Sequence, residues 1–139
     1  MVIDRQWAQL TPLDWDWFAD AWLSELRGKP LGPDDMSQRV VFMNFTAAPS
    51  EQWLFIRLAV AKAESDDELG SIAAGPMEHL LGWHGEAYIG HVEKEAAANE
   101  TFARMLTGVW QYRMAAEVWR RVQEIQARVQ RPLREPAGN

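Results

Sequence analysis

Apolar residues recur along this chain at helical spacing. The first series follows Thr11-Pro12, a capping hydroxyl with a proline behind it, and Gly28 stands where a left-handed residue would close the helix. Its apolar residues fall on one helical face, at i, i+3, i+4, i+7, i+8 and i+11: Trp15, Phe18, Ala19, Trp22, Leu23 and Leu26. The pattern therefore predicts an amphipathic helix between Pro12 and Gly28.

The remaining apolar series also have helical start and stop signals. Predicted helices begin at Asp34, Pro49, Ser65 and Asn99, and a last one carries Val118 to Val129 and stops before Pro132. Only segment 34–45 could be read as a strand, and its acidic start and length of about 12 residues favour a helix. We expect an all-α fold: one compact domain of six to eight short helices over residues 1–139, with 131–139 as a frayed tail.

The stretch from Ile72 to His91 gathers the unusual residues, including all three histidines and four of the nine glycines. Gly75-Pro76 reads as an N-cap and first helical residue, with Glu78 at the third position, where a carboxylate suits the helix start. The apolar face ends at Gly85, predicted to be a left-handed terminal residue, and consists of Met77, Leu80, Leu81 and His84. A second helix follows at once, so we expect a central helix-corner-helix unit.

This segment resembles a widespread family of small bacterial domains of unknown function. The likeness rests on the signature G-P-L-E-x-L-L-x-x-H-G, matched here from Gly75 to Gly85 with Met77 in place of the usual Leu. A downstream Phe102 and the pair Val109-Trp110 complete it, and the similarity extends from Trp53 to Val122. The resemblance implies a fold and a bacterial or phage source, and it brings no activity with it.

Composition and charge narrow the setting. The chain has no cysteine and no apolar run approaching the ~20 residues that span a bilayer, so we expect a cytoplasmic protein without a membrane partner. Residues 1–100 carry a net charge of −10 and residues 101–139 a net charge of +4. An acidic body disfavours contact with phosphate backbones, which argues against a nucleic-acid partner.

Catalytic and metal-binding patterns are weak. His79 and His84 are five residues apart, which on a regular helix places them on different faces, and no HExxH motif is present. We therefore expect no metal and no cofactor, and we expect His84 to bond a carbonyl at the corner. The alternative is a ligand-binding or enzymatic pocket built from Glu78, His79 and His84.

The surplus of tryptophan suggests a binding surface instead. Trp17 lies about 160° round the first helix from Trp15 and beside Asp20, so it is either an exposed anchor or is packed against residues 1–10. The acidic run Asp66-Asp67-Glu68 is either a solvated helix start or part of a face presented to a basic protein.

The leading interpretation is a small acidic protein-binding module of the immunity, antitoxin or inhibitor kind. Its predicted contact residues are Trp17, Asp20, Asp66, Asp67 and Glu68, and its partner is another protein, possibly basic. A structural homodimer is the second alternative, after the pocket hypothesis.

Overall fold

The computed structural model describes residues 5–32 and 35–133, and every regular element in these ranges is helical. The elements are η1 (Arg5–Gln9), α1 (Pro12–Leu26), α2 (Met36–Thr46), α3 (Pro49–Lys62), α4 (Asp66–Ile72), η2 (Ala73–Met77), α5 (Glu78–Ala98), α6 (Glu100–Leu106) and α7 (Ala116–Arg128). The all-α prediction is confirmed. None of the helices in the described ranges has the length and hydropathy needed to cross a bilayer.

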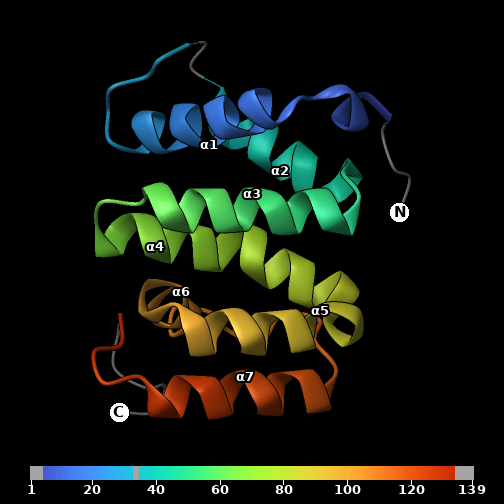
Figure 1. Ribbon diagram of the computed structural model, residues 1–139, viewed down its shortest axis with the longest axis vertical. Coiled ribbons are helices and arrows are strands. Elements are labelled where there is room, and N and C mark those ends of the chain that lie inside the picture. Colours follow the sequence, from blue (N-terminus) through green and yellow to red (C-terminus); the bar gives the residue numbers. More distant parts are fainter. Residues whose placement is uncertain (1–4, 33–34, 134–139) are drawn as a thin grey trace.

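The helices lie in successive rows along the long axis of the molecule (Figure 1). α1 packs on α2 and α3 at one end, α3 contacts α4 and α5 in the middle, and α6 and α7 cover α5 at the other end. One hydrophobic core runs through all rows, because each helix turns its apolar face towards the next row.

α1 and α3 begin where the capping residues in the sequence predict. The Thr11 hydroxyl accepts the Asp14 N–H at 3.1 Å, and the Asp14 carboxylate accepts the Thr11 N–H at 2.8 Å. Gly28 has a φ of +79°, the left-handed conformation expected after α1. At the start of α3, the Glu51 carboxylate accepts the Ala48 N–H at 2.8 Å, one residue before Pro49. Local polar satisfaction thus fixes these helix starts.

The start predicted at Gly75-Pro76 is wrong. α4, η2 and α5 form one continuous helical path, and η2 is a π-helix in which the Glu78 N–H donates to the Ala73 carbonyl five residues back. A π turn is wider than an α turn, so it accommodates a proline that lacks an N–H and whose ring would crowd the carbonyl four residues earlier. Ile72 and Met77, on either side, are fully buried, and this burial holds the path together.

The end predicted at Gly85 is also wrong. Gly28 is the one described glycine with a positive φ, and α5 continues past Gly85 to Ala98. The corner exists as a kink at His84, whose φ of −135° and ψ of 26° leave the helical region. Gly85 is needed for a different reason: a Cβ at this position would lie 3.0 Å from Cγ1 of Val118 in α7. Glycine therefore permits the close approach of α5 and α7.

Candidate functional site

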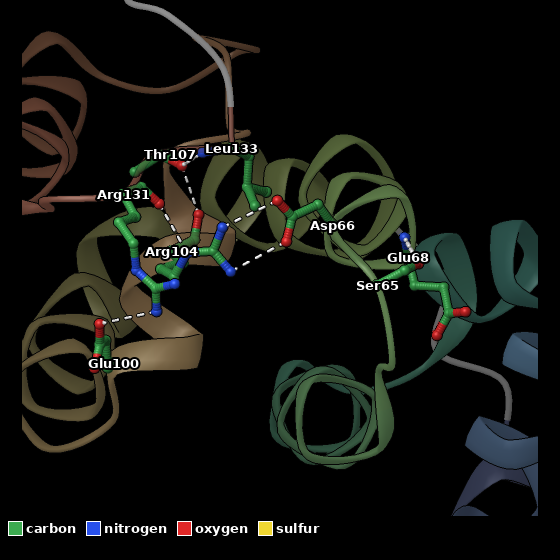
Figure 2. A network of polar contacts seen from close by, with 8 residues as sticks. All are labelled: Ser65, Asp66, Glu68, Glu100, Arg104, Thr107, Arg131 and Leu133. Atoms are coloured by element: carbon green, nitrogen blue, oxygen red, sulfur yellow. Dashed lines mark hydrogen bonds and ion pairs between the residues drawn. The ribbon is translucent and has the colours of Figure 1, made fainter.

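Asp66, a predicted partner contact, is bound within the protein. The Arg104 guanidinium donates to both its carboxylate oxygens, at 3.1 and 3.0 Å, and also to the Arg131 carbonyl at 2.7 Å (Figure 2). This pairing lowers the pKa of Asp66 below its usual value. The same network holds residues 131–133, since the Leu133 N–H donates to the Thr107 hydroxyl at 2.8 Å. Residues 134–139 of the predicted tail lie outside the described residues.

Glu68 is not a surface contact, contrary to the prediction. Its side chain is buried, with the residue 7% exposed, and it accepts two hydrogen bonds from Arg27 at 2.9 and 2.8 Å. Hydrogen bonding to Arg27 lowers the pKa of the Glu68 carboxyl. The Ser65 hydroxyl caps α4 as predicted, but Glu68 accepts the Glu64 N–H at 2.9 Å and does not close a reciprocal capping box. The ion pair between Arg27 and Glu68 therefore joins the end of α1 to α4.

The other predicted acidic contacts divide between paired and open positions. Asp20 shares Lys62 with Asp16, at N–O distances of 3.2 and 2.8 Å. Asp67 is exposed at the start of α4. Since Asp20, Asp66 and Glu68 all serve contacts between helices, the acidic residues do not form a free face around the Asp66–Glu68 run.

Trp17 is the predicted aromatic anchor on α1. It is half-exposed, and it stands at the rim of a pocket of about 590 Å³ whose lining includes Trp7, Leu10, Phe18 and Phe42. Trp7 lies buried within that lining and stacks on Trp15 and Phe18, with ring centroids 5.7 and 5.8 Å apart. Trp17 is thus an accessible aromatic beside a pocket, next to the segment proposed to cover it.

A set of half-exposed aromatic side chains continues from this pocket across the molecule. We define the aromatic strip by its members and their exposed fractions: Trp17 (47%), Phe42 (45%), Phe45 (45%), Trp83 (39%) and Tyr112 (44%). Phe42 and Phe45 are three residues apart, so they are neighbours on α2. The strip therefore crosses from α1 over α2 to α5 and the loop before α7.

The contacts between strip members run through buried rings. Phe42 lies 5.9 Å from the Trp7 ring, and Phe45 meets the His79 ring edge-on at 4.5 Å. His79 in turn lies 5.8 Å from Trp83. Phe42 and Phe45 belong to the helix predicted over residues 34–45, but the sequence pattern could not show that about half of each ring would stay exposed.

His79 is the buried polar residue at the centre of the strip. It is 6% exposed, and neither Nδ1 nor Nε2 has a hydrogen-bond partner. Burial lowers its pKa to about 4, and the charges of His84 and Arg113 act in the same direction. His79 faces Phe45 and Trp83, whereas His84 lines a pocket on the side of the loop before α7, so the two rings influence each other through their charge and not through a shared pocket lining. His79 is neutral at pH 7.

Among the described residues, the His84 ring does not make the predicted bond to a carbonyl. Its Nε2 is buried without a partner, and burial lowers the pKa of the imidazole. His84 lines a pocket of about 380 Å³ together with Trp83, Glu86 and Arg113. The pocket is bounded by α5 on one side and by the loop before α7 and Val118 on the other.

Three contacts hold the loop before α7 against α5. The Glu78 carboxylate accepts the Trp110 N–H at 2.9 Å, which replaces its predicted role at a helix start. A Cβ on Gly82 would lie 2.5 Å from the Tyr112 carbonyl oxygen, so only glycine lets the loop approach. Trp83 supports the Arg113 guanidinium, whose carbon lies 4.1 Å from the ring centroid.

The proposed catalytic set does not assemble as an acid–base group. Glu78 is directed to the loop backbone and is absent from the lining of the pocket that contains His84. Leu81, the remaining motif residue, is buried in the core and also reaches that pocket. Within the described part of the chain, no group of three His, Cys, Asp or Glu residues could hold a metal ion.

Comparison with known proteins places most of this architecture in one family. The model of the family of unknown function DUF6869 matches residues 33–130, which include α2 to α7 and the His84 pocket. The chain belongs to this family. The match agrees with the resemblance to an uncharacterised family, and it leaves α1 with Trp17 outside the DUF6869 segment. No curated protein and no solved structure matches the chain.

Proposed function

We propose that this DUF6869 protein is a protein-binding module of the immunity, antitoxin or inhibitor kind, and that the aromatic strip is its contact surface. The supporting observation is that five half-exposed aromatic side chains from four segments of the fold follow one another, linked by a shared pocket and by contacts with the buried rings of Trp7 and His79. Exposed apolar side chains gathered in this way are unfavourable in water and are typical of interaction sites.

The residue types of the strip fit a protein partner. Tryptophan, tyrosine and arginine are enriched among side chains that dominate binding energies, and the strip ends with Trp83 and Tyr112, with Arg113 stacked on Trp83 beside them. Aromatic side chains have few rotatable bonds, so they lose little conformational entropy on contact. Trp17, predicted as an anchor, begins the strip, whereas the acidic run is replaced as the main contact.

The net charge retains a smaller role. At −6, the protein still attracts a basic partner over long distances, which raises the association rate at low salt. The contact energy comes from the strip, because three of the predicted acidic contacts are engaged inside the protein. The net charge thus sets the association rate, and burial of the aromatic side chains sets the dissociation rate.

The test compares one strip variant with a matched variant outside the strip. Phe45→Ser removes a half-exposed ring from α2, while Leu13→Ser removes an exposed apolar side chain from α1 at a position outside the strip. We expect affinity capture from native cells to retain the same partner on the wild type and on Leu13→Ser. With that partner purified, Phe45→Ser should raise the Kd by about 30-fold, which corresponds to about 2 kcal/mol.

Two outcomes would contradict the proposal. Equal binding by Phe45→Ser and Leu13→Ser, with both variants folded by circular dichroism, would remove the strip as the contact surface. Concentration-dependent self-association of the wild type, abolished by Phe45→Ser in sedimentation experiments, would replace the partner with a second copy and support the homodimer alternative.

A further inference from the structure

We infer that Arg113 and the adjoining pocket form a recognition site for a carboxylate side chain of the partner. This inference rests on the proposed function and adds the chemistry of one contact to it. The pocket of about 380 Å³ stands at the end of the aromatic strip, between the kink of α5 and the loop before α7. A partner segment lying along the strip would thus bring an acidic residue to Arg113.

The fold holds Arg113 in an unusual conformation. Its φ of +59° is the one positive value among the described non-glycine residues. Such a conformation is strained for a residue with a Cβ and persists only where the surroundings impose it. Here the surroundings are the Glu78 bond to Trp110 and the close approach of Tyr112 to Gly82. Both contacts position the loop that presents the guanidinium.

The charge of Arg113 is available for a partner. Among the described residues it stacks on Trp83, and no carboxylate of these residues lies within ion-pair distance of it. Glu86 lines the same pocket without reaching the guanidinium. Most other arginines already pair with carboxylates: Arg27, Arg39, Arg57, Arg104, Arg120, Arg121 and Arg131. Stacking keeps the planar fork of Arg113 fixed for bidentate contact.

The polar groups of the pocket favour an anion with a single charge. Nε2 of His84, which lines the pocket, is buried without a hydrogen-bond partner, and a neutral imidazole can donate one N–H. One guanidinium with a neutral imidazole balances one negative charge, whereas a phosphate monoester carries about two at pH 7. Glu86 on the pocket wall also opposes a second charge. A carboxylate therefore fits better than a phosphate.

The experiment titrates the protein with the α-amides of N-acetyl-glutamate and N-acetyl-glutamine, which differ only in the side-chain carboxylate. Binding is followed by nuclear magnetic resonance at the Trp83 indole N–H and the His84 ring. We expect saturable shifts with the glutamate probe and none with the glutamine probe. Arg113→Met should weaken glutamate-probe binding at least about tenfold, in line with loss of a charge-assisted bidentate contact.

Two further variants sharpen the result. Arg128→Met removes an exposed arginine of α7 that forms no ion pair with another described residue, and it should leave the titration unchanged. Glu86→Gln removes the opposing charge from the pocket wall and should tighten binding of the glutamate probe. Opposite effects at Arg113 and Glu86 would identify the site by sign of charge and not by folding alone.

The inference fails if the glutamate probe produces no saturable shift, or if Arg113→Met binds it as well as the wild type does. If acetate binds as tightly as the glutamate probe, the site accepts free carboxylates and the assignment to a partner side chain is wrong. The protein-binding proposal is judged separately, by the effect of Phe45→Ser on partner affinity, so each idea can fail without the other.

Discussion

His79 links the stability of this protein to pH through one buried ring. Its pKa of about 4 in the folded state lies below the ordinary value of 6.5, so between these pH values the unfolded chain binds more protons. The stability that depends on neutral His79 is complete above pH 6.5 and is lost as the pH falls towards 4. Protonation in place would bury a charge between Phe45 and Trp83.

We therefore predict that His79→Phe flattens the acid side of the stability curve. Relative to the value at pH 7.5, the wild type should lose up to about 3 kcal/mol more unfolding free energy by pH 4 than the variant does. Urea unfolding at several pH values measures this difference. Parallel curves for the two proteins would show that His79 is not the group that titrates.

Local sequence signals predict some helix starts of this protein correctly and one of them wrongly. The starts at Thr11, Pro49 and Ser65 were predictable, because each cap is satisfied by residues within one turn. Gly75-Pro76 carries the same local signal, yet the helix passes through it as a π turn. Burial of Ile72 and Met77 decides that outcome, and this burial depends on helices that local patterns do not place.

Gly85 and Gly90 give a matched test of helix packing in α5. Both lie in helical segments, but a Cβ at Gly85 would be 3.0 and 3.1 Å from the Val118 methyl carbons, while nothing lies within 4 Å of one at Gly90. Gly90→Ala should stabilise the protein by up to about 1 kcal/mol through helix propensity. Gly85→Ala should instead destabilise it by about 1 kcal/mol, because overpacking exceeds that gain.

Thermal unfolding of the two variants and of Gly85→Ala combined with Val118→Ala measures this effect. The second substitution should remove the specific penalty of the added methyl group, apart from the cost of truncating Val118 itself. Equal stabilisation by Gly85→Ala and Gly90→Ala would show that α7 yields freely to α5.

For the whole molecule, charge pairs join helices that are distant in sequence. Arg27 and Glu68 are 41 residues apart, and Arg104 and Asp66 are 38 apart. The acidic run was readable from the sequence, but its use was not, since no local pattern identifies a partner at such separation. The same limit applies to the aromatic strip, whose exposure depends on which helix faces remain uncovered.

Substitution of the ion-paired Glu68 should lower the free energy of unfolding more than substitution of the exposed Asp67. Glu68→Gln leaves Arg27 facing a neutral amide in a largely buried site, and we expect a loss of about 2 kcal/mol or more in unfolding free energy. Asp67→Asn changes an exposed residue of the same turn and should alter stability by no more than about 0.5 kcal/mol. Denaturant unfolding at neutral pH compares them, and similar losses would contradict the structural role of Glu68.

The Arg104 network sets where this polypeptide can be shortened or extended at its C-terminal side. One guanidinium holds Asp66 of α4 and the Arg131 carbonyl together, while Thr107 anchors Leu133, whose side chain lies near Gly108 (Figure 2). A fusion partner or affinity tag attached beyond Leu133 should leave these hydrogen bonds in place. A boundary drawn before Arg131, as the limit of the family match at residue 130 would suggest, removes the Arg131 carbonyl that accepts the Arg104 hydrogen bond.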